Sequence, residues 1–136
     1  MKKTIFLSAI AMTLLACNPS NPLLEAPETP YGVPAFDQVK IEHYMPAFEA
    51  AIAEQKAEID AIVTNQAEPT FDNTIVALDR TGMLLERVSG VFFNVLEADG
   101  NDEMNVIAEQ VSPMLSELCD GIILNDQLFQ RVKAVY

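Results

Sequence analysis

The amino-acid sequence predicts an all-α fold, a helical bundle that forms the N-terminal portion of a larger, mostly helical protein. Along residues 41–136, apolar side chains recur at steps of three and four, the spacing that places them on one face of a helix. No stretch alternates apolar and polar residues as a half-buried strand does. One helical stretch carries an apolar arc wider than half its circumference, which a single neighbouring helix does not cover.

Residues 1–16 are predicted to be a signal peptide that is removed from the mature protein. Two lysines provide a positive start, and residues 5–15 form an apolar run too short to span a bilayer. The tripeptide Leu-Leu-Ala directly before Cys17 resembles the lipobox of bacterial lipoproteins. We therefore expect Cys17 to be the lipidation site, since its thiol can form a thioether to diacylglycerol. The alternative is ordinary secretory cleavage, which leaves Cys17 as a free or disulfide-bonded cysteine.

Residues 17–36 are predicted to contain the lipidated cysteine and a proline-rich tether. The prolines are Pro19, Pro22, Pro27, Pro30 and Pro34. Because proline disfavours helix and sheet and favours extended backbone, this segment should hold the folded part away from the membrane. Tyr31, Val33 and Phe36 are the expected points at which its end docks. Residues 37–136 then form the N-terminal helical domain.

The first helix is predicted from Ile41 to about Asn65. Seven apolar residues lie on one of its faces at steps of three and four. They are Ile41, Tyr44, Phe48, Ile52, Ile59, Ile62 and Val63. The opposite face is charged, and the helix must end before Pro69, because proline restricts the residue that precedes it.

The second helix is predicted as one continuous element that is capped by Thr70 and runs past Leu96. Its packed face carries Phe71, Ile75, Leu78, Gly82, Leu85, Ser89, Phe92 and Leu96. The apolar arc is widened by Leu84, Val88, Val91 and Val95. Gly82 costs about 1 kcal/mol of helix propensity, so we expect another helix to approach closely at Gly82 and Ser89. The wide arc indicates that this helix belongs in a larger bundle.

Two further helices are predicted in the last third of the chain. Gly100 and Asn101 supply a helix stop and then an N-cap, so a third helix should start near Asp102. Its apolar face carries Met104, Ile107, Val111, Leu115, Leu118 and Ile122. Pro113 removes one backbone donor and should kink this helix or divide it. Asn125 caps a fourth helix that shows no stop signal, so we expect the helical domain to continue beyond Tyr136.

The charge balance excludes nucleic acid as a partner. Eight Lys and Arg residues are scattered among twenty Asp and Glu residues, for a formal net charge of −12. A surface that binds a phosphate backbone needs clustered basic side chains, which release counterions. We interpret the acids as solvated helix faces that favour solubility. The alternative is an acidic site that recruits basic peptides.

Three features invite a catalytic or metal-binding interpretation. His43 lies off the apolar stripe of the first helix, and we expect it to form local hydrogen bonds there. A zinc site of the H-E-x-x-H type needs a second histidine, which the chain lacks. Cys119 lies among apolar residues of the third helix and is predicted to be a small buried thiol, not a nucleophile. Residues 97–103 are acidic but do not have EF-hand spacing, so a helix end and a helix start explain them. The sequence therefore predicts no catalytic and no metal-binding residue.

Five sequence stretches run together through nearly all of residues 21–136. They read NPLL from Asn21, VPAFDQVKIEHYMPAFEAAI from Val33, PTFDNTIVALDRTG from Pro69, SGVFFNVLEADGNDEMNVIAEQVSPMLSE from Ser89 and LNDQLFQRVKAVY from Leu124. These stretches resemble the N-terminal part of the thimet-oligopeptidase family of zinc metallopeptidases, which includes oligopeptidase A and the peptidyl-dipeptidases. The most specific part is PTFDNTI followed by SGVFFN, which is most similar to the peptidyl-dipeptidase branch.

The resemblance implies a largely helical, two-lobed fold with a deep channel between the lobes. It also implies a zinc ion, held by H-E-x-x-H and a more C-terminal Glu, that polarises the scissile carbonyl and activates water. None of those positions lies in residues 1–136, so no catalytic or metal residue is carried over. The intact protein is expected to be a zinc-dependent peptidase, of peptidyl-dipeptidase or oligopeptidase type, acting on short peptides. The chain, as one wall of the channel, is expected to be inactive alone.

The alternative function is that of a non-enzymatic helical lipoprotein that acts as an interaction or scaffold module. In both cases the expected partners include the membrane, reached through the lipid on Cys17. Asn18 follows Cys17 at the place where an Asp would resemble an inner-membrane retention signal. The expected localisation is therefore the outer membrane, facing the periplasm.

Overall fold

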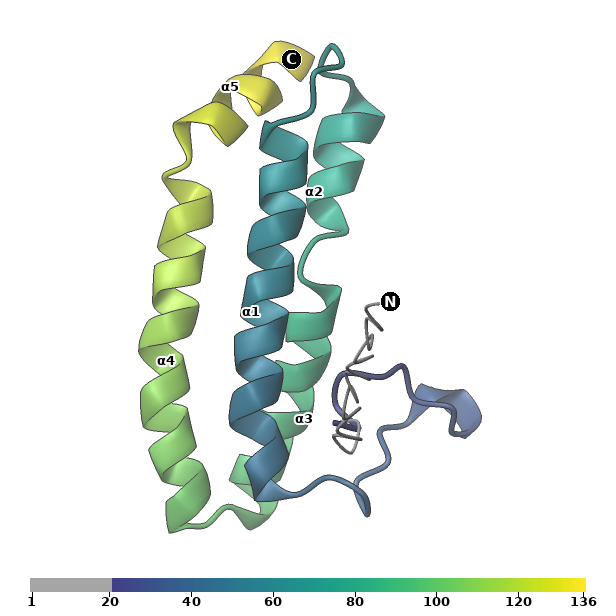
Figure 1. Ribbon diagram of the computed structural model, residues 1–136, viewed down its shortest axis with the longest axis vertical. Helices are drawn as coiled ribbons and strands as arrows, with labels where there is room; N and C mark the ends of the chain where they lie inside the picture. Colours follow the sequence, from purple (N-terminus) through teal and green to yellow (C-terminus); the bar gives the residue numbers. More distant parts are fainter. Residues whose placement is uncertain (1–20) are drawn as a thin grey trace, which may run out of the picture.

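The computed structural model describes residues 21–136, which form an elongated bundle of helices (Figure 1). A turn of 3-10 helix, η1 (Pro30–Gly32), precedes the long helix α1 (Ile41–Val63). The π-helical turn η2 (Phe71–Val76) leads into the short α2 (Ala77–Asp79) and then into α3 (Met83–Asp99). The last elements are α4 (Asp102–Ile123) and α5 (Asp126–Val135). Residues 21–136 contain no strand, and the predicted all-α fold class is confirmed.

α1 lies at the centre of the bundle, between α4 and α3 (Figure 1). Its buried residues are Tyr44, Ala47, Phe48, Ala51, Ile52, Ile59 and Ile62, which combine the predicted apolar stripe with small alanines. Phe48 of α1 meets Phe92 of α3 edge to face, with ring centroids 5.3 Å apart, and both rings are wholly buried. Such a pair adds about 0.5–1.5 kcal/mol beyond the burial of its area. The contact between these two rings therefore helps to fix α3 against α1.

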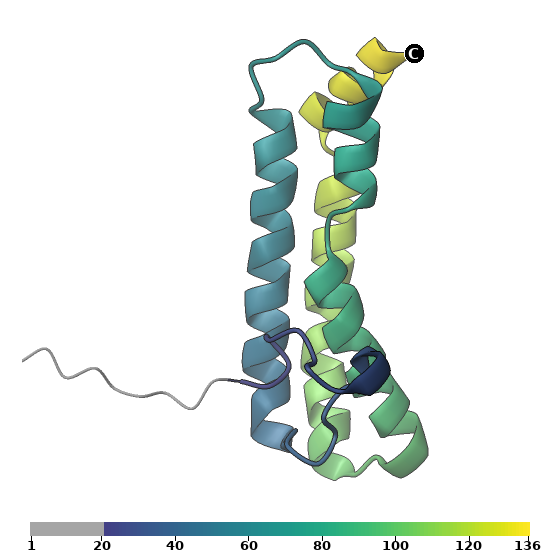
Figure 2. The ribbon, with the colours of Figure 1, turned by 90° about the vertical axis from the view of Figure 1, so that its right-hand side faces the viewer.

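A second, smaller hydrophobic cluster lies at the C-terminal end of α1. Ile59 and Ile62 pack there with Leu128 of α5, and none of the three side chains is more than 6% exposed. α5 crosses this end of the bundle beside η2 (Figures 1 and 2). The side chain of Arg131 strengthens the contact, because its Nη1 donates to the carbonyl of Asn65 at 2.6 Å.

The predicted single helix from residue 71 past residue 96 is wrong, because residues 80–82 form a turn that divides it. Gly82 adopts the left-handed conformation, with φ 76° and ψ 14°. Its N–H donates to Glu58 Oε2 of α1 at 2.8 Å, and a Cβ on Gly82 would lie 2.5 Å from the Gln55 side chain. The close approach of another helix expected at Gly82 is present. The glycine, however, serves a helix break and not a helix interior.

Side-chain caps start three of the elements at the predicted residues. Thr70 Oγ1 accepts from the N–H of Asn73 at 3.1 Å. At the start of α4, Asn101 Oδ1 accepts from the N–H of Met104 at 3.0 Å. At the start of α5, Asn125 Oδ1 accepts from the N–H of Leu128 at 2.9 Å. Each cap satisfies a backbone donor that has no partner within its own helix. The predicted helix starts are confirmed.

Phe71 was predicted to lie on the packed face, and this prediction is wrong: its side chain is 61% exposed. Phe71 begins the π-helical turn η2, whose wider hydrogen-bond spacing shifts its side chains out of phase with an α-helix. The inward position is taken by Thr74, which is fully buried and donates its hydroxyl to Asn73 Oδ1 at 2.9 Å. A buried hydroxyl with a partner avoids the cost of an unsatisfied donor.

α4 is one continuous helix through Pro113, so of the two predicted outcomes, a kink or a division, the division is wrong. Proline removes only one donor, the one that would reach the carbonyl of Glu109. Both Glu109 and Pro113 lie on the exposed side of the helix, where water can satisfy that carbonyl. The opposite face buries Met104, Val111 and Leu118, as the apolar pattern predicts. Packing of this face holds the helix together across the proline.

The N-terminal segment, residues 21–39, packs on the bundle instead of extending from it as its prolines predict (Figure 2). Leu23 is only 3% exposed and belongs to the main hydrophobic cluster. The docking points expected from the sequence are in fact exposed: Tyr31 to 102%, Val33 to 50% and Phe36 to 50%. The segment is thus held by Leu23 near its beginning and by Val39, which packs against the same cluster, and not by the three side chains that were predicted to dock.

The predicted signal peptide and Cys17 lie outside the described residues. Among residues 21–136, no helix combines the length and the apolar content that crossing a bilayer demands.

Candidate functional site

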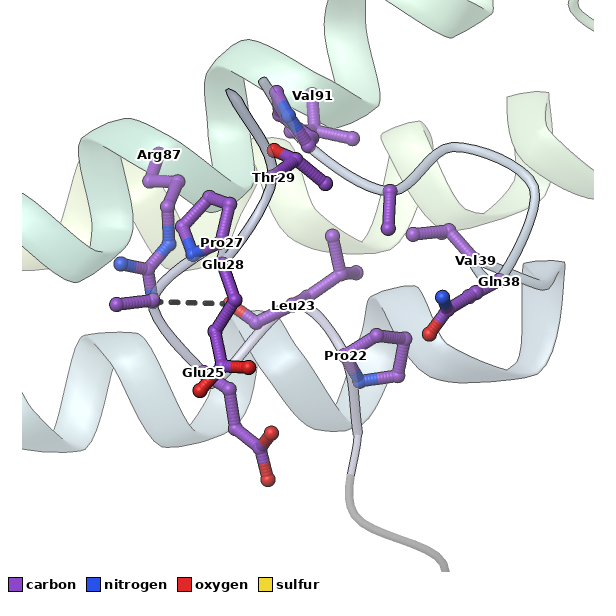
Figure 3. Close-up of a pocket in the computed structure, with 13 residues that line it drawn as sticks. Pro22, Leu23, Glu25, Pro27, Glu28, Thr29, Gln38, Val39, Arg87 and Val91 are labelled. Carbon is purple, nitrogen blue, oxygen red and sulfur yellow. Dashed lines mark hydrogen bonds between the residues drawn. The ribbon is translucent and has the colours of Figure 1, made fainter. Parts of the chain in front are cut away.

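A cavity of about 300 Å³ lies between the N-terminal segment and α3 (Figure 3). Its apolar wall includes Leu23, Val39 and Val91. Its polar side chains are Glu25, Glu28, Thr29, Gln38 and Arg87. The cavity exists because Leu23 is drawn into the core while the chain around η1 loops outward and returns to α1.

Arg87 is the central polar residue of this cavity. Its Nη2 donates to the carbonyl of Leu23 at 3.2 Å, a contact between residues 64 positions apart (Figure 3). Its Nε is buried and has no hydrogen-bond partner among the described residues. The sequence pattern did not single out Arg87 as a functional residue. A signal for this contact was available in the sequence. Arg87 lies on a helix whose apolar arc is too wide for one neighbour to cover, which suggests that another segment packs on the helix and contacts the arginine.

The charges of the cavity are not paired with one another. The one ion pair among residues 21–136 joins Lys40 and Glu42 at 3.8 Å, and both side chains are 72% exposed, so it adds little stability. The cavity combines a guanidinium with the carboxylates of Glu25 and Glu28 but holds no histidine, cysteine or serine. Its chemistry is suited to binding a polar group and not to nucleophilic catalysis.

His43 occupies the third position of α1, where its ring closes the helix start. Its Nδ1 accepts from the backbone N–H of Lys40 at 3.0 Å. Its carbonyl accepts from Nδ2 of Asn21 at 2.8 Å, which ties the N-terminal segment to α1. The local hydrogen bonding expected of His43 is therefore present.

Cys119 is exposed, and the predicted burial of its thiol is wrong. The apolar face of α4 is formed by its neighbours Leu118 and Ile122, which pack into the core cluster. Cys119 follows Leu118 by one residue, so it is turned by about 100° away from that face. Apolar neighbours in the sequence therefore did not show whether Cys119 lies on the packed face of α4 or beside it.

The described part of the chain brings no three His, Cys, Asp or Glu side chains together as a metal site. The acidic residues 97–103 are divided between the end of α3 and the start of α4, where Asn101 acts as the cap. Residues 21–136 therefore do not provide the ligand set that a catalytic zinc ion requires.

Comparison with known proteins shows close similarity to peptidases. The chain is 44% identical over 117 residues to a dipeptidyl carboxypeptidase of Salmonella typhimurium, which aligns 86% of this chain with 17% of that protein. It is 47% identical over 116 residues to a dipeptidyl carboxypeptidase of Escherichia coli, and the alignment covers 85% of this chain and 17% of that protein. Oligopeptidase A of Salmonella typhimurium is 29% identical over 110 residues, with 81% and 16% aligned. No protein-family model matches the chain.

These proteins are homologues of the chain over a small part of their own length. The chain spans about a sixth of the length of the two dipeptidyl carboxypeptidases. Their aligned segments make up most of this chain, so the helical bundle as a whole, and not one motif, carries the similarity.

Proposed function

We propose that this chain is the N-terminal helical portion of a zinc-dependent peptidase that hydrolyses short peptides. The observation that carries the proposal is 44–47% identity to two dipeptidyl carboxypeptidases over most of the chain. Identity to oligopeptidase A is lower, so release of dipeptides from the C-terminus of a substrate is favoured over endopeptidase activity.

In this proposal the chain contributes a wall of the substrate channel and no catalytic group. The long helices α1, α3 and α4 lie side by side and share one hydrophobic cluster, which makes them a stiff surface. A rigid wall can restrict a channel to short, unfolded peptides. The described residues do not fit a zinc ion, so both the ion and the base that activates water belong to other parts of the intact protein. Residues 1–136 alone are then inactive.

We further propose that the protein is anchored by lipid on Cys17 and faces the periplasm from the outer membrane. The positive start, the short apolar run and the tripeptide before Cys17 support this anchor. Replacement of Cys17 by Ala should release the protein from membranes into the soluble fraction. Continued membrane association of the variant would contradict lipidation at this position.

The peptidase activity is tested with the gene product as the cell makes it. Membranes from cells with the intact gene are incubated with an N-acylated tetrapeptide, and the released C-terminal dipeptide is measured. The expected result is release that a chelator abolishes and added zinc restores, with matched membranes from a deletion strain as the control. Equal, chelator-insensitive release from both membranes would contradict the peptidase proposal and favour a scaffold role.

A further inference from the structure

The position at which the N-terminal segment docks limits how far the bundle can stand from a lipid anchor. Asn21 Nδ2 donates to the carbonyl of His43 at 2.8 Å, and Leu23 is buried. Only three residues separate Cys17 from Asn21. A fully extended chain spans at most about 3.6 Å per residue, so Asn21 lies within about 14 Å of the lipidated residue.

Exposed apolar side chains gather on the segment that follows this attachment point. We call Leu24, Tyr31, Val33, Phe36 and Met83 the anchor-side patch; their exposed fractions are 38%, 102%, 50%, 50% and 67%. Phe36 and Met83 line the same shallow groove, so the patch spans the N-terminal segment and the start of α3. The core of the bundle covers none of these five side chains fully.

Tyr31 is held outward by a backbone conformation that is unfavourable for tyrosine. It has φ 65°, and it is the one non-glycine residue with positive φ among residues 21–136. A bulky residue in this region costs on the order of 1–3 kcal/mol. Its ring is fully exposed, so packing of the Tyr31 side chain within residues 21–136 does not offset that cost. Contact with a surface outside the chain would offset it.

Most of the other exposed large apolar side chains lie toward the far end of the bundle. They are Phe71 of η2 and Ile123, Leu124, Phe129 and Tyr136, around α5 and the turn that precedes it, whereas Val106 lies near the start of α4. In both views η1 lies beside the N-terminal half of α1, and the C-terminus lies beyond its C-terminal end (Figures 1 and 2). α1 has 23 residues and so rises roughly 33 Å. The short link from Cys17 therefore favours the anchor-side patch over the far end for membrane contact.

We propose that the anchor-side patch rests on the surface of the lipid bilayer, so that the bundle lies against the membrane instead of standing away from it. The inference rests on the lipid anchor of the proposed function. Tyrosine is suited to this place, because its amphipathic ring favours the level of the headgroups. Glu25, Glu28 and Asp37 lie on the same segment, so zwitterionic headgroups are favoured over anionic ones.

Residues 1–136 offer a matched pair of reporter positions for this orientation, because this part of the protein contains no tryptophan. Tyr31 and Tyr136 are both fully exposed, at 102% and 100%. Tyr31→Trp adds one tryptophan within the patch and Tyr136→Trp adds one at the far end, and the emission of the unaltered protein is subtracted from that of each variant. Each lipidated protein is reconstituted into phosphatidylcholine vesicles whose acyl chains carry bromine, which quenches tryptophan at close range.

The expected result is blue-shifted and strongly quenched emission from Tyr31→Trp, with Tyr136→Trp unchanged between brominated and ordinary vesicles. Quenching of Tyr31→Trp should weaken when anionic phosphatidylglycerol replaces part of the phosphatidylcholine. If both proteins float with the vesicles but Tyr31→Trp is no more quenched than Tyr136→Trp, the orientation is wrong and the anchor stands. If neither protein floats with the vesicles, the anchor fails and the orientation fails with it.

Discussion

At the scale of single residues, Tyr44 shows how burial acts on ionisation. Its ring is 4% exposed and meets Phe92 at a centroid distance of 4.9 Å. Burial raises the pKa of the Tyr44 phenol above its ordinary value of 10.0, because the charged form loses hydration. The folded chain therefore holds this proton more tightly than the unfolded chain does.

The raised pKa predicts a loss of stability in alkaline solution. The contribution of Tyr44 to the free energy of unfolding is fully present below pH 10.0 and is lost as the pH rises through the pKa of the folded state. Urea unfolding is measured at a series of pH values on both sides of 10. Tyr44→Phe should decline less steeply than the unaltered chain above pH 10. Parallel curves for the two proteins would show that the phenol ionises equally in both states.

Gly82 is predicted to be indispensable to the break before α3. Gly82→Ala places a Cβ 2.5 Å from the Gln55 side chain at a φ of 76°, so stability should fall by about 1–2 kcal/mol. Gly90→Ala is the matched control, because Gly90 lies within α3 and a Cβ there meets nothing within 4 Å. That variant should gain about 0.5–1 kcal/mol. Chemical denaturation of both variants measures the change in the free energy of unfolding. An increase in stability for Gly82→Ala would contradict the turn observed at Gly82.

At the scale of elements, Pro113 is expected to weaken α4 without dividing it. In a helix interior proline is about 3 kcal/mol less favourable than alanine, so Pro113→Ala should stabilise the chain by up to this amount. Pro69 lies in the loop before η2 and provides the control. Pro69→Ala should lower stability slightly, because the unfolded chain gains freedom. A thermal melt of each variant gives the sign, and destabilisation by Pro113→Ala would mean that α4 is not continuous.

Arg131 is expected to hold α5 on the bundle. Its guanidinium donates to the carbonyls of Asn65 and Ala67 and, at 3.4 Å, to Asn73 Oδ1. Arg131→Met should therefore accelerate hydrogen exchange in α5 while leaving α1 and α3 protected. Lys133→Met is the control, because Lys133 lies exposed on the same helix. If both variants accelerated hydrogen exchange in α5 equally, Arg131 would have no specific role in holding α5.

The sequence predicted elements well where one helix face decides their position. The apolar stripes of α1 and α4 and the caps at Thr70, Asn101 and Asn125 depend on local spacing. The break at Gly82 depends on Glu58, which lies 24 residues away and could not be located from periodicity. Local patterns thus predict helices, and tertiary contacts decide where they end.

At the scale of the whole molecule, the sequence did not reveal how the N-terminal segment is placed. Its prolines predicted an extended tether that docks only at its end, but Leu23 fills the core and Arg87 donates to the Leu23 carbonyl from 64 residues away. The cavity at Arg87 arises from this docking and was not anticipated. The wide apolar arc of α3 was the available signal, because the segment covers part of it.

Whether this chain is a wall of a zinc peptidase is best tested by reading and translating the gene beyond the codon for Tyr136. We expect the reading frame to continue into a long helical region with an H-E-x-x-H motif, whose two histidines lie one turn apart and bind zinc. A stop codon directly after Tyr136 would contradict this expectation, because the residues described here hold no ligand set for the metal.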